Sequence, residues 1–336
     1  MNDKIITLGH GAGGETMHRF IRDLFLRHFA NPALNALADA ALLDVEGKRL
    51  AFTTDSYVVK PLEFPGGDIG KLAVCGTVND LAVMGARPLY LSAGFIIEEG
   101  FCVVTLERIV HSMADAAFAA GVQIVTGDTK VAGRGECDGL FVNTSGVGVC
   151  PLGKGLCSHV IAAGDAIIVS GALGDHGLAI LEAREHLSFK TEIPSDCASL
   201  NGLIGNVLEI SAGVKWMRDP TRGGLAAALS ELVEGQSFGA MIHETDLPVR
   251  EEVRAVCELL GFDPMHLANE GKVVAVVEAS DAERVLQIMR GHELGHEAAL
   301  IGRITADGAG AVRVKTEVGG VRRLQRPAGE LLPRIC

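Results

Sequence analysis

The stretch FPGGDIGKLAVCGTVNDLAVMGARPLYLSAGFIIEEG, residues 64–100, contains a predicted helix followed closely by a predicted strand. Asp68 stands directly before the apolar residues 69–84, where its side chain is expected to accept hydrogen bonds from the first free backbone N–H groups of a helix. Residues 89–97 are rich in the aromatic and branched side chains typical of strands. A helix that leads into a strand within a few residues favours a mixed α and β architecture.

The same alternation continues on both sides of this stretch. Further helices are predicted at residues 15–29, 105–120, 178–185, 225–233 and 281–290, and further strands at residues 49–54, 123–126, 140–148, 166–170, 272–277 and 311–315. This order predicts an α/β (α+β) fold rather than a helical bundle or a β-sandwich.

The length of 336 residues predicts about two domains. A Gly-rich segment near residues 150–163 lies between two predicted strands, so the first domain is expected to span 1–150 and the second 151–318. Residues 319–336 combine glycine and proline without regular periodicity and are expected to form a flexible tail that ends in Cys336.

Composition excludes several classes of function. The formal net charge is −12, which argues against a protein that binds nucleic acid, because affinity for phosphate backbones requires clustered cations. No apolar run reaches the ~18 residues of a membrane span, and the first residues lack the order of a signal peptide. The eight cysteines contain no C-x-x-C pair, so we expect reduced thiols and a cytoplasmic location.

Four aspartates of the first half stand at or near predicted helices and strands: Asp39, Asp55, Asp80 and Asp128. A carboxylate in such a place must be solvated, hydrogen-bonded or bound to a metal, because burial of an isolated charge is costly. Carboxylates that converge are typical ligands of Mg²⁺, which also bridges nucleotide phosphates. The alternative is that each aspartate caps a helix or forms a turn.

Two glycine-rich segments have free backbone N–H groups that suit an anion. The first, GHGAGGE at residues 9–15, contains Gly13 and Gly14 and precedes a predicted helix, although a flexible lead-in explains it equally well. The second, RDPTRGG at residues 218–224, contains Asp219 and also precedes a helix, so the alternative is an ordinary helix entry. Neither segment matches a standard nucleotide-binding fingerprint.

Glu270 lies in ANEGK, residues 268–272, just before a predicted strand. A carboxylate there can point into a cleft between domains and act as a general base. The alternative is an exposed glutamate in a turn.

His292-Glu293-Leu294-Gly295-His296 matches the H-E-x-x-H pattern of zinc proteases. Glycines on and beside this segment interrupt the helix that a zinc site requires, so we expect a loop without metal.

Taken together, these segments resemble the hydrogenase-maturation carbamoyl dehydratase family. The resemblance runs essentially end to end, and the closing PRIC, with Cys336 as its last residue, distinguishes this family from its wider superfamily. That superfamily includes aminoimidazole ribonucleotide (AIR) synthetase, selenophosphate synthetase and thiamine-monophosphate kinase. The tracts that carry the resemblance are HGAGG, DAALLD, FTTDSYVV, the stretch 64–100, IVTGDTKV, GLFVNTSGVG, MRDPTRGGLA, ANEGK and PRIC.

The resemblance implies a two-domain PurM-like fold, with an N-terminal ATP-binding and dimerisation domain. It implies ATP and Mg²⁺ as cofactors and a homodimer as the assembly. A partner carbamoyltransferase, HypF, is expected to load a carbamoyl group onto Cys336, which this chain then dehydrates to a thiocyanate. The cyanide is expected to pass to iron on a HypC–HypD scaffold, for the Fe(CN)₂CO centre of [NiFe]-hydrogenase.

The resemblance also implies roles for individual residues. Lys130 is expected to neutralise the transferred phosphoryl group, and Glu270 to remove protons from the carbamoyl nitrogen. The residues implied to bind Mg²⁺ and phosphate are Asp39, Asp55, Asp80 and Asp128, with Asp219, Gly13 and Gly14 in the nucleotide site.

Two other readings remain open at this point. A selenophosphate synthetase-like or thiamine-monophosphate-kinase-like phosphotransferase fits the same superfamily, although the first usually carries a reactive Cys or Sec near its N-terminus and no cysteine precedes Cys75 here. A cyanide carrier or scaffold, with ATP as a structural switch, is the reading from a different class.

Overall fold

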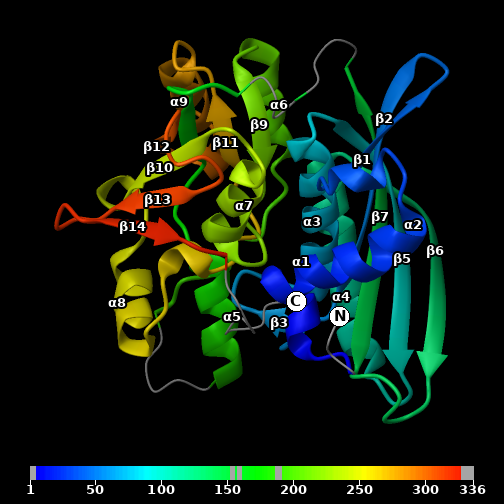
Figure 1. Ribbon diagram of the computed structural model, residues 1–336. Coiled ribbons are helices and arrows are strands. Elements are labelled where there is room, and N and C mark those ends of the chain that lie inside the picture. Colours follow the sequence, from blue (N-terminus) through cyan, green and yellow to red (C-terminus); the bar gives the residue numbers. More distant parts are fainter. Residues whose placement is uncertain (1–4, 152–155, 157–160, 186–190, 327–336) are drawn as a thin grey trace.

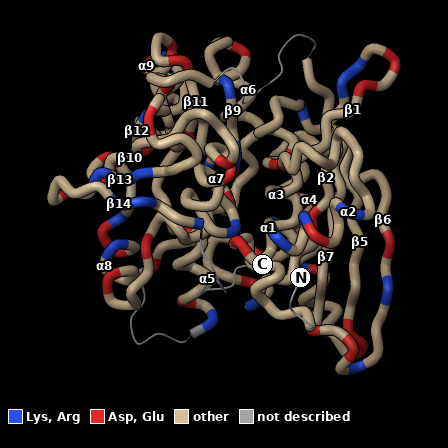
Figure 2. Tube along the Cα trace, in the orientation of Figure 1, with Lys and Arg blue, Asp and Glu red and all other residues tan. Residues whose placement is uncertain are grey.

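The computed structural model describes residues 5–151, 156, 161–185 and 191–326. Two sheets, one in each half of the chain, organise these residues (Figure 1). Acidic and basic residues are interspersed along the described trace, without an extended basic stripe in this view (Figure 2). None of the helices in the described part of the chain is long and apolar enough to cross a membrane.

The N-terminal half contains a five-stranded sheet of order β1-β2-β7-β5-β6. One face packs against two helices, α3 and α4, through a core that includes Ile69, Ile109 and Leu140. The other face carries exposed side chains, among them Tyr90 and Ile96. The bounds are β1 Ala41–Val45, β2 Lys48–Tyr57, β5 Arg87–Glu98, β6 Gln123–Ala132, β7 Leu140–Cys150, α3 Ile69–Val83 and α4 Val103–Ala120, with a small hairpin of β3 Glu63–Phe64 and β4 Gly67–Asp68.

The C-terminal half contains a seven-stranded sheet of order β14-β13-β10-β12-β8-β11-β9. Helix α7 packs on one face, and α6 and α9 pack on the other. The strands are β8 Ala166–Val169, β9 Val214–Arg218, β10 Gly239–His243, β11 Val274–Val277, β12 Ala299–Thr305, β13 Val312–Lys315 and β14 Val321–Leu324. The helices are α5 Asp175–Glu185, α6 Asn201–Ile210, α7 Gly224–Val233, α8 Glu251–Leu260 and α9 Ala282–Arg290.

Helix α3 connects the two halves. Asp68 caps it by accepting hydrogen bonds from the backbone N–H groups of Gly70 and Lys71, at 2.7 and 2.9 Å, which confirms the predicted cap. Near its other end, Ala82 and Val83 are buried in the same core as α6 and α9. A helix anchored on both sides places the polar residues of its last turns between the two sheets.

The predicted helix 15–29 is helical but not uniform. A π-helical segment, Ile21–Leu26, joins α1 Glu15–Phe20 to α2 Arg27–Phe29. Short 3₁₀ helices occur elsewhere, at Leu8–Gly11, Leu34–Ala36, Glu244–Asp246, Pro264–His266 and Glu293–Gly295.

The expected loop at 292–296 is confirmed. His292 Nδ1 accepts a hydrogen bond from the Leu294 N–H at 3.1 Å, and the His296 ring contacts the Arg290 carbonyl at 3.0 Å. Residues Glu293–Gly295 form a single 3₁₀ turn, so the two histidines do not lie on one face of an α-helix.

The prediction that the tail starts at residue 319 is wrong, because the sheet continues beyond this residue. Residues Val321–Leu324 form β14, which pairs with β13 and buries Leu324 in the core, because Gly319 and Gly320 make a tight turn back onto the sheet. Cys336 lies outside the described residues.

Candidate functional site

Three aspartates from distant parts of the chain converge between the two sheets. Asp39 lies just before β1, Asp80 in α3, and Asp219 just after β9. One carboxylate oxygen of each lies within 4.8 Å of the other two. The structure thus brings together three of the five predicted aspartates in a set of oxygen ligands that suits Mg²⁺.

The Thr53 hydroxyl links two of these residues. The Thr53 hydroxyl of β2 lies 2.8 Å from Asp80 Oδ2 and 2.9 Å from the Asp39 carbonyl oxygen. Asp55, two residues along β2, lines the same cavity and accepts a hydrogen bond from the Tyr57 hydroxyl at 3.1 Å. Asp55 therefore faces the site without belonging to the three-carboxylate group.

Arg218 is a site residue that the sequence analysis did not single out. Its guanidinium pairs with Asp39 at 3.0 Å and with Glu231 of α7 at 2.9 Å, and Glu231 also contacts His18 at 2.8 Å. Arg218 is the first residue of the RDPTRGG tract, but its partners lie far away in sequence. The one feature of the sequence that pointed to Arg218 as a site residue was its position next to Asp219.

Burial raises the pKa values of all three aspartates. It raises the pKa of Asp39 to about 6, against the opposing effect of Arg218, and that of Asp219 to about 8. The pKa of Asp80 is well above its ordinary value, because of burial first and repulsion by Asp55 second. Converging carboxylates that resist ionisation fit a site completed by a divalent cation.

Affinity for Mg²⁺ should therefore increase as the pH rises from about 6 to about 8, the pKa values of Asp39 and Asp219. The cation binds the ionised carboxylates, so below these values it must displace protons from Asp39 and Asp219, and above them it displaces none from these two. Titration calorimetry in two buffers of different ionisation enthalpy measures both the affinity and the protons released.

Asp80→Asn should abolish this magnesium binding, whereas Asp115→Asn, an exposed aspartate on α4, should leave it unchanged. Affinity that does not vary over this pH range would contradict the assignment of the cluster.

The cluster opens into a cavity of about 320 Å³ lined by residues of both halves. Gly13 lines it with φ +79°, and a Cβ at this position would lie 2.7 Å from the Arg222 Cβ, so only glycine fits. Gly14 is buried and is the N-cap residue of α1. The first glycine-rich segment is thus packed against the second rather than being a flexible lead-in.

Glu270 lies on the wall of the same cavity and is only 4% exposed, so the alternative of an exposed turn is wrong. Burial, and then repulsion by Asp219, raises the pKa of Glu270 well above its ordinary value. A carboxyl group with a raised pKa is a stronger base once ionised, which suits proton abstraction.

Asp128 and Lys130 lie away from the cluster. They are exposed on the edge strand β6 and pair with each other at 2.9 Å. Their positions in the register, opposite Gly94 and Ile96 of β5, put them on the sheet face that carries Tyr90 and Ile96. The single chain therefore does not bring these two predicted residues to the site, and their roles stay predictions.

Comparison with known proteins identifies the family of the chain. Residues 37–150 match the family described as AIR synthase related protein, N-terminal domain, and residues 162–315 match the corresponding C-terminal domain. Carbamoyl dehydratase HypE of Rhodobacter capsulatus is 53% identical over 100% of this chain and 99% of its own length.

Two solved structures are similar over nearly the whole fold. A HypE–HypF complex matches with a TM-score of 0.87 and 50% identity, over 92% of this chain and 99% of that chain. HypE in complex with ATP matches with a TM-score of 0.82 and 49% identity, over 98% and 100%. With the expected PurM-like fold and the carboxylate cluster in place, the chain belongs to the HypE carbamoyl dehydratase family of hydrogenase maturation.

Proposed function

We propose that this chain dehydrates an S-carbamoyl group on Cys336 to an S-thiocyanate at the expense of ATP. The carbamoyl oxygen attacks the γ-phosphorus of ATP and ADP leaves. The carbon–oxygen bond then breaks with loss of phosphate, and the nitrogen gives up both protons to form the C≡N bond. Hydroxide is a poor leaving group and phosphate a good one, so phosphorylation makes the dehydration feasible.

The observation that carries this proposal is the common cavity of the carboxylate cluster and Glu270. We assign Glu270 as the base that accepts a proton from the carbamoyl nitrogen. Asp39, Asp80 and Asp219 would hold Mg²⁺, which neutralises negative charge on the phosphates when it is bound. Asp55 and the Gly13 backbone line the remaining wall, where they suit contacts with the nucleotide.

The position of Arg326 supports delivery of the tail to this cavity. Its side chain is 8% exposed and pairs with Glu234 at 3.1 Å and with Glu231 at 3.9 Å. Glu231 lines the cavity, so the chain is held beside the site at residue 326. Glu231 and Glu270 line the same cavity, and the residues from 327 to 336 can span up to about 33 Å when extended, so we expect Cys336 to reach Glu270.

The partners are part of the proposal. The similar HypE–HypF complex supports HypF as the carbamoyltransferase that loads Cys336. A HypC–HypD complex would accept the cyanide on its iron, because cyanide is a strong ligand of iron. We propose that the reaction takes place in the cytoplasm, where thiols stay reduced.

Phosphate release tests the function against its alternatives. One phosphate should be released per chain carbamoylated on Cys336, and essentially none from uncarbamoylated chains. Release from both at the same rate would favour a kinase-like phosphotransferase or an ATP-driven scaffold.

We also propose a homodimer through the N-terminal sheet. Phe52 of β2 and Tyr90 and Ile96 of β5 are 44–48% exposed on the face opposite α3 and α4. Exposed apolar side chains on one sheet face are typical of an interface. Asp128 and Lys130 lie on the same face, next to any second copy.

Ile96→Asp should therefore convert the dimer to a monomer, because it places a charge in the apolar interface. Sedimentation velocity measures the change. Phe118→Asp on α4, where Phe118 is 88% exposed, is the matched control and should remain dimeric. A dimer that survives Ile96→Asp would exclude this face.

A further inference from the structure

Glu270 lies in a loop whose backbone belongs to no helix or strand. Glu270 lies between the short helix Pro264–His266 and β11, and backbone groups in such a loop need partners from elsewhere. Its carbonyl oxygen accepts hydrogen bonds from the Asn79 side chain of α3 and from the Ala198 N–H, both at 3.3 Å. The conformation of the loop is thus determined by residues distant in sequence.

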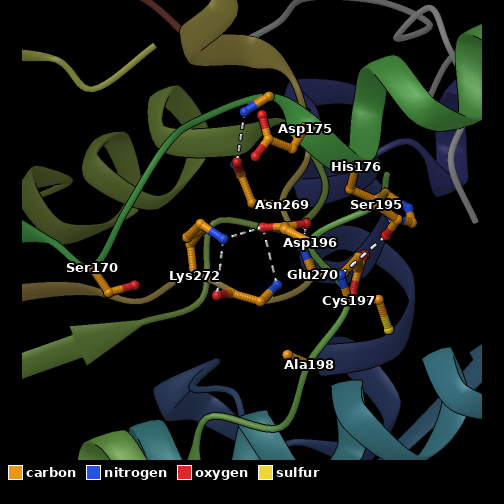
Figure 3. Close-up of polar contacts among 12 residues, drawn as sticks. Ser170, Asp175, His176, Ser195, Asp196, Cys197, Ala198, Asn269, Glu270 and Lys272 are labelled. Atoms are coloured by element: carbon orange, nitrogen blue, oxygen red, sulfur yellow. Dashed lines mark hydrogen bonds and ion pairs between the residues drawn. The ribbon is translucent and has the colours of Figure 1, made fainter. Parts of the chain in front are cut away.

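Asp196 holds the N–H groups of this loop. Its Oδ1 accepts a hydrogen bond from the Glu270 N–H at 2.9 Å, and its Oδ2 accepts one from the Gly271 N–H at 3.3 Å (Figure 3). One carboxylate therefore binds two consecutive backbone amides on both sides of the Glu270 Cα. This fixes the direction in which the Glu270 side chain leaves the backbone.

Lys272 completes the arrangement. Its ammonium group lies 3.1 Å from Asp196 Oδ2 and 3.4 Å from the Gly271 carbonyl oxygen. The Asp196 side chain is 3% exposed and that of Lys272 is 11% exposed, so the ion pair compensates for burial of both charges. Figure 3 shows these contacts as one connected network that joins Lys272 and Asp196 to the loop.

Close backbone packing leaves the loop little freedom. A Cβ on Gly271 would lie 1.9 Å from the Asp196 carbonyl oxygen, so only glycine permits this approach. Asp196 and Lys272 do not line the cavity of the carboxylate cluster but a separate one of about 660 Å³. Asp196 thus acts on Glu270 through hydrogen bonds to its backbone, and its charge also helps to raise the pKa of Glu270.

We infer that Asp196, held by Lys272, is the positioning residue that aims Glu270 at the substrate. The inference rests on the proposed role of Glu270 as the base. A proton transfer needs its base within hydrogen-bonding distance, and a displacement of about 1 Å costs on the order of 100-fold in rate.

Single-turnover dehydration of the carbamoylated full-length protein at saturating ATP tests the inference. Asp196→Asn keeps one acceptor oxygen and should slow conversion roughly 10-fold, and Asp196→Ala should slow it roughly 100-fold. The dissociation constant for ATP, measured by calorimetry, should change less than about twofold in both variants, because Asp196 does not line the proposed nucleotide cavity.

A second buried Asp–Lys pair provides the control. Asp165 accepts the Ala162 N–H at 2.7 Å and pairs with Lys215 at 3.0 Å, but neither side chain lines the cavity of the cluster. Asp165→Asn should lower the melting temperature to a similar degree as Asp196→Asn and leave the conversion rate unchanged. Equal losses of rate in Asp165→Asn and Asp196→Asn would show that Asp196 has only a structural role.

Glu270→Gln separates this inference from the proposed function. If Glu270→Gln retains the wild-type rate, Glu270 is not the base and both assignments fail. If Glu270→Gln is inactive while Asp196→Asn and Asp196→Ala convert at the wild-type rate, only the inference about Asp196 is overturned. A weaker binding of ATP that accounts for the whole loss in the Asp196 variants would also overturn it.

Discussion

Cys336→Ala should abolish formation of the thiocyanate while leaving ATP binding intact. Without the thiol there is no atom to carry the carbamoyl group, so the loss is complete rather than partial. The proposed nucleotide site is made of residues far from Cys336 in sequence, among them Asp39, Asp80 and Asp219. Calorimetry with ATP and mass measurement of the product check the two halves of this expectation.

Cys102→Ala is the control for this variant. Cys102 is exposed, and hydrogen bonds from the backbone and side chain of Thr105 lower its pKa, so it is a plausible competing thiol. The variant should accept and convert the carbamoyl group normally. Loss of ATP binding in Cys336→Ala would instead mean that the last residue has a structural role in the nucleotide site.

Glu270→Gln should lower the rate of dehydration by about 100- to 10,000-fold, the usual contribution of a positioned general base. The substitution keeps the size of the side chain and removes the carboxylate. Single-turnover conversion of carbamoylated protein measures the effect, and binding of ATP should be nearly unchanged. Glu252→Gln, in the separate cavity beside Asp196 and Lys272, is the matched control and should convert normally.

The pH dependence gives an independent check on Glu270. Burial raises the pKa of Glu270 above its ordinary value, and only the ionised form accepts a proton. The wild-type rate should therefore rise with pH until Glu270 is ionised, and the Glu270→Gln variant should lose this rise. A wild-type profile that falls with increasing pH over the same range would contradict the assignment.

Local sequence patterns predicted much of the fold. Helix α3 and its Asp68 cap were readable from the sequence, because an N-cap and an apolar helix are local features. Strands β9, β10 and β12 were missed, because short apolar strands cannot be distinguished from other buried segments by periodicity. Strand β14 was missed because its flanking glycines and prolines indicated a tail.

The site was predictable in its residue types but not in all its contacts. Of the four aspartates predicted to bind the metal, Asp39 and Asp80 converge, and the third member of the cluster is Asp219, which was predicted for the nucleotide site. The pairing of Arg218 with Asp39 joins residues from the two halves of the chain, and no local pattern indicates it. Asp128 was grouped with the others by its tract, but its strand lies on the sheet edge, away from the cluster.

The mass of the C-terminal peptide tests the central claim most directly. The protein is incubated with carbamoyl phosphate, ATP and the carbamoyltransferase partner. The mass of the peptide that contains Cys336 is then measured by mass spectrometry. We expect a carbamoyl adduct on Cys336 that loses one water only when ATP is hydrolysed. An active partner that leaves Cys336 unmodified, or an adduct that persists while ATP is consumed, would contradict the account.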